Sequence, residues 1–254
     1  MEIFLYTILF IIGIFFGSFF TLAVYRIPKK EDILIKHSYC PNCNHKLGFF
    51  DLFPVFSFVF LGGKCRYCEN KIRARYLILE ILAGITFVII AFGIKIDIFN
   101  IKNIIELAFL LIYISILFII AGIDKENIKI EKKVLFFGFV IEILYMIYQY
   151  TLGIYNVYQY VIYLILFIIL LILSIIDLKI NLKEKYCIQI LYLCLYIIFW
   201  CGSKIYILSS ILTFLIIAIK QLVSKHKKLP IGFLLSISNI IVIIVLNVLV
   251  NYIV

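Results

Sequence analysis

Long apolar stretches recur from one end of the chain to the other, and they constrain its fold more than any other feature. An apolar run of about 18 residues or more predicts a membrane span, because a helix satisfies its own backbone hydrogen bonds in lipid. With 65% hydrophobic residues and a mean hydropathy of +1.17, the chain carries more apolar surface than a soluble core could bury. We therefore expect an all-α polytopic membrane protein with about eight transmembrane helices. They are predicted near residues 3–25, 76–94, 104–123, 134–153, 157–176, 186–200, 205–222 and 231–253.

The basic residues indicate how these helices are oriented. All but three of the 24 Lys and Arg residues fall in alternate loops of the predicted layout. These loops are 26–75, 124–133, 177–185 and 220–230. Because Lys and Arg concentrate on the cytoplasmic side, we expect these loops in the cytosol and both termini outside. The net charge of +10 then reflects topology and contact with anionic lipid headgroups, and no nucleic-acid partner is expected.

One loop is long enough to form a domain. Residues 26–75 are the one sizeable polar segment, between a first span in 1–25 and the remaining spans in 76–254. Glu2 precedes the first span and Arg26 follows it, which is the reverse of a secretory signal peptide and favours an uncleaved anchor. The expected organisation is a first transmembrane helix, a cytosolic loop domain and a multi-span membrane domain.

Four cysteines in this loop form two Cys-x-x-Cys pairs, Cys40 with Cys43 and Cys65 with Cys68. Each pair can turn two thiolates toward one point, and two pairs at this spacing are a strong signal for tetrahedral Zn²⁺. Two disulfides are the alternative, which the reducing cytosol disfavours. His45 is close enough in sequence to be a ligand, although solvent exposure is the commoner state of such a histidine. Four sulfur ligands leave no open position, so the zinc is expected to be structural.

The sequence around these cysteines resembles the prepilin peptidases, also called type IV leader peptidases. The resemblance is specific across residues 13–84 and looser to about residue 240. It rests on Gly17-Ser18-Phe19, Tyr25-Arg26-Ile27-Pro28, Asp51-Leu52-Phe53-Pro54, Gly63-Lys64-Cys65-Arg66-Tyr67-Cys68, Arg75-Tyr76 with Glu80, and Leu229-Pro230-Ile231-Gly232-Phe233. It implies a bacterial enzyme of the cytoplasmic membrane that cuts the basic leader from prepilins or pseudopilins. Many members of the family also methylate the new N-terminus with S-adenosylmethionine.

The same resemblance implies that Asp124 and Asp177 are the two catalytic aspartates. Each ends a predicted span, and one outward and one inward span between them bring both to the cytosolic membrane edge. Two close carboxylates cannot both ionise easily, so they share a proton and can activate water while protonating the scissile carbonyl. Position alone also fits ordinary solvated acids, since ionisable groups are common at the membrane edge.

The protease half departs from the family pattern. The family usually carries Gly-x-Gly before its second aspartate, where this chain has Ser174 and Ile176. Glycine allows a backbone or peptide to approach closely, which a β-branched side chain hinders. Two hypotheses therefore stand, an active intramembrane aspartic endopeptidase and a non-catalytic relative that binds pilins or assists their assembly. A transporter is a third class, but the membrane acids follow no single path through the predicted spans.

Three further assignments come from the resemblance. It implies that Gly63 and Lys64, beside the second Cys pair, belong to the methyl-transfer activity and so to an S-adenosylmethionine site. The chain has no Gly-rich nucleotide fingerprint that would indicate such a site independently. Glu80 matches a family glutamate one turn into the second span, where it could hold a substrate amine or orient the cytosolic loop. The expected partners are prepilin or pseudopilin substrates and the lipid bilayer.

Overall fold

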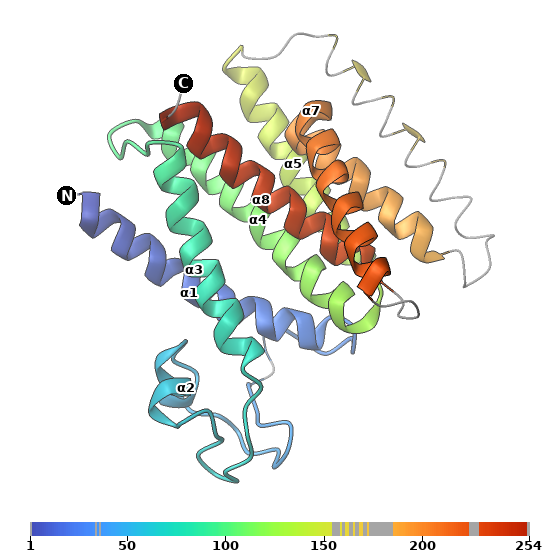
Figure 1. Cartoon of the computed structure of the whole chain (residues 1–254). Coiled ribbons are helices and arrows are strands. Elements are labelled where there is room, and N and C mark those ends of the chain that lie inside the picture. The colour runs from blue at the N-terminus through green and yellow to red at the C-terminus, as the bar shows by residue number, and fades with distance from the viewer. Residues whose placement is uncertain are drawn as a thin grey trace. The chain divides into compact units, whose positions relative to one another are not determined.

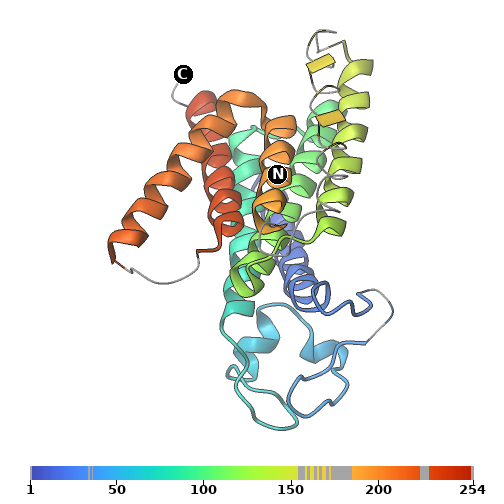
Figure 2. The same cartoon turned by 90° about the vertical axis from the view of Figure 1, so that its right-hand side faces the viewer.

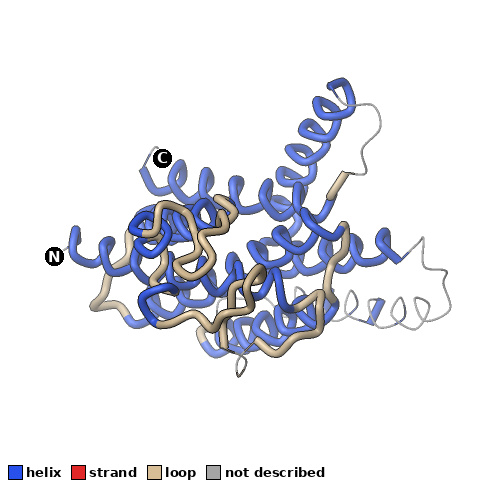
Figure 3. Tube along the Cα trace, turned by 90° about the horizontal axis from the view of Figure 1, so that it is seen from below, coloured by secondary structure: helices blue, strands red, loops and turns tan. Residues whose placement is uncertain are grey.

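The computed structural model describes residues 2–33, 35, 37–153, 185–223 and 229–252, together with seven isolated positions between 158 and 172. This described part is helical, with two isolated β-bridges and no strand (Figure 3). The all-α prediction is therefore confirmed. The helices are α1 (Glu2–Arg26), η1 (Phe49–Asp51), α2 (Phe56–Phe60), α3 (Arg75–Gly93), α4 (Ile101–Asn127), α5 (Lys132–Thr151), α7 (Lys185–Val223) and α8 (Ile231–Tyr252) (Figure 1).

Five of the described helices, α1, α3, α4, α5 and α8, are long and apolar enough to cross a membrane. The sixth and seventh predicted spans both fall in α7, where the non-helical backbone of Gly202 (φ 73°, ψ 171°) separates two helical segments. The first segment, Tyr186–Gly202, is apolar but shorter than the five spans. The fifth predicted span, 157–176, lies outside the described residues apart from isolated positions. The count of eight spans is therefore not confirmed.

The chain forms two compact units, residues 1–107 with 246–254 and residues 108–245. In the first unit, α1 and α3 pack closely because small residues line their contact. A Cβ atom on Gly13 would lie 2.6 Å from the Cα of Gly84, and one on Gly17 would lie 2.6 Å from the Cα of Glu80. Numbering rises along one helix as it falls along the other, so the two helices are antiparallel. Such small residues allow the close backbone approach that stabilises helix pairs in lipid.

The polar loop between α1 and α3 belongs to this first unit and forms a lobe at one end of the two helices (Figure 2). It contains η1, α2 and the two β-bridges, Tyr39 with Lys46 and Lys64 with Lys71. Arg26, at the end of α1, is only 1% exposed and donates to the carbonyls of Asp32 (3.0 Å) and His37 (2.9 Å). A buried guanidinium therefore anchors the start of the loop to the helix.

The second unit is built around α4, whose inner face is fully buried. Tyr113 stacks on Trp200 of α7 with ring centroids 4.6 Å apart, and its hydroxyl donates to Asn239 Oδ1 of α8 (2.8 Å). Asn239 in turn donates to Ser209 Oγ (3.0 Å). Buried polar groups of this kind are stable in an apolar core only when they are paired. This network therefore fixes how α4, α7 and α8 align around the polar site described below.

Candidate functional site

The two Cys pairs fold into two turns with the same backbone pattern. The N–H of the first cysteine donates to the carbonyl five residues on, at 3.0 Å for Cys40 and 2.9 Å for Cys65. The carbonyl of the same cysteine accepts from the N–H four residues on, which belongs to Asn44 (2.8 Å) or Glu69 (2.9 Å). Asn44 and Glu69 both have positive φ, 57° and 55°. Each Cys-x-x-Cys segment thus forms a compact knuckle by its own local hydrogen bonds.

The two knuckles bring four sulfurs together. The Sγ atoms of Cys40, Cys43, Cys65 and Cys68 all lie within 4.8 Å of one another, and those of Cys40 and Cys68 are 3.9 Å apart. Zn²⁺ with Zn–S bonds of about 2.3 Å holds its sulfurs about 3.8 Å apart in a tetrahedron. All four cysteines are free rather than joined as disulfides. The donor set therefore fits a metal ion, and a closed four-sulfur site is typical of structural zinc.

The electrostatics of the cluster also favour a bound cation. The N–H of His45 favours the Cys43 thiolate, but lost hydration and the adjoining sulfurs together raise the pKa of Cys43 to about 11. The N–H of Asn70, with the side-chain amide of Asn42, lowers the pKa of Cys68 to about 7. The Cys68 thiol therefore ionises more easily than the Cys43 thiol, because adjacent thiolates repel each other. A metal ion removes that repulsion and deprotonates its ligands.

Asp51 joins the two halves of the loop. Its Oδ1 accepts from Arg66 Nε (2.6 Å), and its Oδ2 accepts from the Tyr67 hydroxyl (3.1 Å) and the Gly48 N–H (3.0 Å). Burial alone would raise the pKa of Asp51, but the bonds from Arg66, Gly48 and Tyr67 outweigh it and lower that pKa. The His45 ring lies on Tyr67, with centroids 3.6 Å apart, and His45 is not part of the sulfur cluster.

Glu80 attaches the loop to α3. The side chain is 8% exposed, and Oε2 accepts the N–H of Val55 at 2.7 Å. Val55 follows Pro54 and has a positive φ of 64°, which is an unfavourable backbone conformation for a β-branched residue. This bond fits the second role considered for Glu80, that of orienting the loop.

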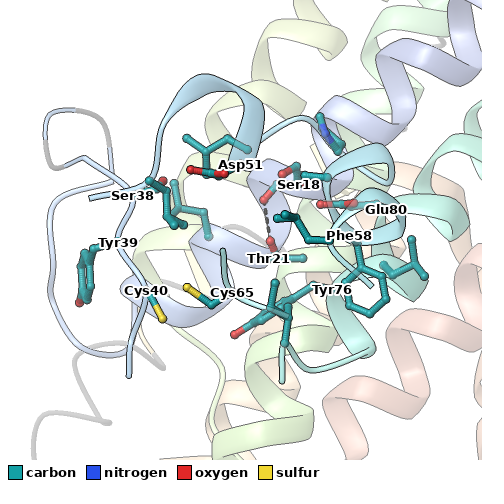
Figure 4. A pocket seen from close by; sticks show the side chains of 18 of the residues that line it. Ser18, Thr21, Ser38, Tyr39, Cys40, Asp51, Phe58, Cys65, Tyr76 and Glu80 are labelled. Carbon is teal, nitrogen blue, oxygen red and sulfur yellow. Dashed lines mark hydrogen bonds between the residues drawn. The ribbon is translucent and has the colours of Figure 1, made fainter. Parts of the chain in front are cut away.

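A cavity of 420 Å³ lies between α1, the start of α3 and the loop (Figure 4). Its walls are mostly aromatic and aliphatic side chains, with the hydroxyls of Ser18 and Thr21 and the carboxylate of Glu80 among them. Cys40 and Cys65 also line it, so the sulfur cluster and the cavity share a wall.

Gly63 and Lys64 do not line this cavity. Gly63 has a φ of 69°, and a Cβ atom there would lie 3.0 Å from the ring of Phe58, which does line the cavity. Lys64 is exposed and forms the bridge with Lys71. Gly63 therefore lies behind Phe58 in the cavity wall, and neither Gly63 nor Lys64 is among the residues that line the cavity.

In the second unit, Asp124 is fully buried and lies within α4, which continues to Asn127. Its Oδ2 accepts the N–H of Phe233 (2.9 Å) in the first turn of α8 and the hydroxyl of Tyr186 (3.0 Å). Its Oδ1 is buried and has no hydrogen-bond partner among the described residues. The partial positive charge of a helix N-terminus favours an anion at this position. Tyr186 and the first turn of α8 therefore hold one oxygen of Asp124, and the other oxygen has no partner among the described residues.

Tyr186 and Gly232 shape the surroundings of this carboxylate. The Tyr186 oxygen accepts the N–H of Ile231 (2.9 Å) while its hydroxyl donates to Asp124. A Cβ atom on Gly232 would lie 3.1 Å from the Asp124 carboxylate and 2.9 Å from Ile130 Cδ1, so the close approach of α8 requires glycine. The motif around Gly232 gave a sequence signal, whereas Tyr186 is one of 18 tyrosines and belongs to no pattern.

The second predicted aspartate, Asp177, lies outside the described residues. The same holds for Ser174 and Ile176, which replace the glycines of the family pattern. The assignment of Asp124 and Asp177 as a pair therefore stays a prediction.

Comparison with known proteins gives matches to the first third of the chain and some way beyond. Residues 11–94 match the family described as Bacterial Peptidase A24 N-terminal domain. The chain is similar to proteins named prepilin leader peptidase/N-methyltransferase. That of Vibrio cholerae is 39% identical over 100 residues, covering 36% of this chain and 38% of the relative. That of Bacillus subtilis is 34% identical over 133 residues, covering 52% and 50%. That of Myxococcus xanthus is 35% identical over 79 residues, covering 31% and 24%. The chain thus matches half or less of the length of these relatives, and no solved structure matches it.

Proposed function

We propose, from the match of residues 11–94 to the Bacterial Peptidase A24 N-terminal domain and from the similarity to proteins named prepilin leader peptidase/N-methyltransferase, that this chain is an intramembrane aspartic endopeptidase. Its substrates are prepilins or pseudopilins, from which it removes the basic leader. The cut falls at the cytosolic membrane edge, and the apolar pilin helix stays in the bilayer.

The observation that carries the proposal is the state of Asp124. This carboxylate is 0% exposed, with Oδ2 held by Phe233 and Tyr186 and with Oδ1 unpartnered among the described residues. Burying a carboxylate with one unpaired oxygen costs folding free energy, so a protein that retains such a group is expected to use it. Ionisable groups within membrane helices are accordingly candidates for function. A solvated acid at a helix end, the alternative considered from the sequence, would be exposed.

In the proposed mechanism, Asp124 and Asp177 share one proton and titrate as a pair. One carboxylate takes a proton from water as the water attacks the scissile carbonyl carbon, while the other protonates the carbonyl oxygen. As the tetrahedral intermediate collapses, the C–N bond breaks and the leaving nitrogen takes a proton from the pair. A hydroxyl group of the intermediate returns a proton to the pair, which restores its starting state. Tyr186 and the N-terminus of α8 keep the Asp124 carboxylate in place throughout.

The proposed location is the bacterial cytoplasmic membrane, with both termini outside and the cysteine loop in the cytosol. The five apolar helices and the bacterial relatives support a membrane protein, and the basic loops support this orientation. Zinc held by the four cysteines would stabilise the loop, which could bind the basic leader. Methylation of the new N-terminus with S-adenosylmethionine is proposed as a second activity, on the strength of the relatives' names.

The test is cleavage of a co-reconstituted prepilin by the purified full chain. We expect Asp124→Asn and Asp177→Asn each to lower the cleavage rate by about 10²–10⁴-fold, the usual contribution of an acid–base group. The matched control is Asp97→Asn, an exposed aspartate between α3 and α4, which should cleave at the wild-type rate. Cleavage by the Asp124→Asn variant at the wild-type rate would overturn the assignment of the aspartate pair.

A second candidate function is a non-catalytic protein that binds pilins. Ser174 and Ile176 favour it, because both replace glycines that the family usually carries beside its second aspartate. It predicts leader binding by the wild-type chain without turnover, and no effect of either aspartate substitution. Turnover by the wild-type chain excludes it.

A further inference from the structure

The cysteine loop carries an aromatic surface that neither the sulfur cluster nor the Asp124 site uses. We call it the phenylalanine patch, and it consists of Phe49, Phe50, Phe53, Phe56 and Phe60, four of them at least half exposed. The ring centroids of Phe49 lie 5.8 Å from Phe50 and 6.2 Å from Phe53, and those of Phe53 and Phe56 are 5.5 Å apart. An open groove of 740 Å³ lies among these rings. So large an exposed apolar surface indicates contact with a partner or a membrane.

Two contacts place this patch beside the membrane-spanning parts of α1 and α3. The ring of Phe53 lies 5.6 Å from that of Phe15 in α1, and the N–H of Val55 donates to Glu80 in α3. With its 19 residues, α3 is about 28 Å long and needs nearly its whole length to cross a hydrocarbon core of about 30 Å. Its first residue, Arg75, therefore lies at the membrane edge, and Glu80 lies about 8 Å further in. A segment bonded to Glu80 is thus level with the bilayer and does not stand clear of it.

The patch also continues the lipid-facing surface of α1. Phe15, Phe16 and Phe19 are 41–44% exposed on this apolar helix, and exposed apolar side chains of a membrane span face lipid. Phe15 belongs to that surface and also contacts Phe53 of the patch. The bilayer that surrounds α1 therefore reaches the patch as well. The apolar helix of a pilin is the other candidate occupant, but lipid surrounds α1 whether or not a substrate is bound.

The charge of the loop favours an anionic membrane surface. Among the described residues of 26–75, seven exposed side chains are basic and two are acidic. The basic ones are Lys29, Lys30, Lys46, Lys64, Arg66, Lys71 and Arg73, and the acidic ones are Asp32 and Glu69. Each basic side chain near an anionic leaflet is attracted by about 1 kcal/mol. Apolar side chains combined with an excess of basic ones are typical of surfaces that bind at the membrane interface.

We propose that the phenylalanine patch is an interfacial membrane anchor, whose rings insert into the leaflet beside α1 while the basic side chains of the loop contact anionic headgroups. Interfacial apolar side chains reach about 5–10 Å into the boundary between headgroups and acyl chains, which agrees with the depth of Glu80. The anchor holds the cysteine loop against the membrane surface. It does not depend on catalysis, so it applies equally to a peptidase and to a pilin-binding protein.

The first test measures contact between the patch and lipid. Trp200 is the one tryptophan of the chain, and Trp200→Phe keeps a ring beside Tyr113. In this background, Phe60→Trp places a reporter in the patch, and Asn70→Trp places one at an exposed position of the second knuckle outside the groove. The full chain is studied in nanodiscs without prepilin. We expect phospholipids brominated near the top of the acyl chain to lower Phe60→Trp emission at least about twofold and to leave Asn70→Trp nearly unchanged. Equal quenching of the two variants would overturn the anchor.

A second reporter guards against a local effect of one substitution. Phe50 is 79% exposed at another part of the patch, and Phe50→Trp should be quenched as Phe60→Trp is. Resistance of residues 26–75 to limited proteolysis shows that each variant keeps the loop folded. Quenching at one of the two positions alone, in folded variants, would contradict insertion of the patch as a unit.

The role of charge is tested by changing the lipid. We expect Phe60→Trp to be quenched more strongly in nanodiscs that contain phosphatidylglycerol than in phosphatidylcholine alone. This excess should disappear at about 1 M salt, because salt screens the attraction between basic side chains and headgroups. Equal quenching in the two lipids would contradict the contact between the basic side chains and anionic headgroups.

Addition of prepilin distinguishes the two candidate occupants. If the patch inserts into lipid, quenching of Phe60→Trp should persist when prepilin is added in excess. If prepilin abolishes the quenching, or if the patch is shielded from a water-soluble quencher only when prepilin is present, the patch binds the pilin helix and the membrane anchor is refuted.

Discussion

The sulfur cluster and the Asp124 site are held together over very different distances in the sequence. Each Cys knuckle is closed by hydrogen bonds to residues four or five positions away. Asp124 is instead bound by Tyr186, 62 residues on, and by Phe233, 109 residues on. Chemistry carried by a local motif is therefore visible in the sequence, and chemistry assembled from distant helices is not.

The two regions also differ in what stabilises them. The loop is polar, and its described residues form two short helices, η1 and α2, and two isolated β-bridges. So small a unit buries little apolar surface, and a bound metal would supply much of its folding free energy. The Asp124 site lies in a helical unit with a large apolar core, which includes the fully buried Leu117 and Ile120 of the same helix. The predictions below test this contrast, from the largest expected effect to the smallest.

Removal of the metal should unfold the loop and spare the helices. Structural Zn²⁺ contributes about 10–16 kcal/mol in small zinc domains, which is more than a loop of this kind can replace. We expect chelation, or Cys65→Ser, to make residues 26–75 sensitive to limited proteolysis while the far-ultraviolet helix signal persists. Cys187→Ser, at an exposed cysteine of α7, is the matched control and should stay resistant. Loss of the helix signal would mean that the two regions are not independent.

Removal of one hydroxyl should weaken the Asp124 site without unfolding it. Tyr186→Phe deletes the bond to Asp124 Oδ2 and the acceptor of the Ile231 N–H, which frees the carboxylate to rotate. We expect kcat for prepilin cleavage to fall about tenfold with KM unchanged. This fall corresponds to an increase of about 1.4 kcal/mol in the activation free energy.

The control for this change is Tyr148→Phe, which removes a buried hydroxyl that has no hydrogen-bond partner among the described residues. It should leave both kinetic constants at their wild-type values. A larger KM for Tyr186→Phe with unchanged kcat would mean that Tyr186 contacts the substrate and does not position Asp124.

The smallest expected effect concerns the Asp51–Arg66 pair. The pKa of Asp51 is lowered in the folded loop, so its contribution to stability is complete above the unfolded pKa of about 4 and is lost as pH falls through the folded pKa. Because Arg66 is half exposed, the contribution should be about 1 kcal/mol or less. Thermal melting of the loop can be monitored by its sensitivity to proteolysis. The melting temperature of the wild type should exceed that of Asp51→Asn at pH 6, and the difference should disappear below about pH 4. A difference that stays constant with pH would show that the charge of Asp51 is not the cause.

Some of the fold and part of the candidate site could be predicted because their signals are local. The apolar runs predicted α1, α3, α4, α5 and α8, since lipid admits little besides helices at those lengths. The sixth and seventh spans were predicted to be separated between residues 200 and 205, and the kink at Gly202 lies in this interval. The structure joins the two segments in one helix, α7. The end of α4 was placed too early, since Asp124 lies one turn inside the helix rather than at its end.

The sequence by itself determined that the chain is a helical membrane protein with a four-cysteine loop, because hydropathy and Cys-x-x-Cys spacing act over a few residues. Only the tertiary structure decided that Tyr186 and α8 hold the carboxylate of Asp124, and that Glu80 fixes the loop at Val55. It also decided that Gly63 backs the cavity rather than lining it. These are contacts between residues far apart in the chain, and they form only when whole helices pack, which no local pattern encodes.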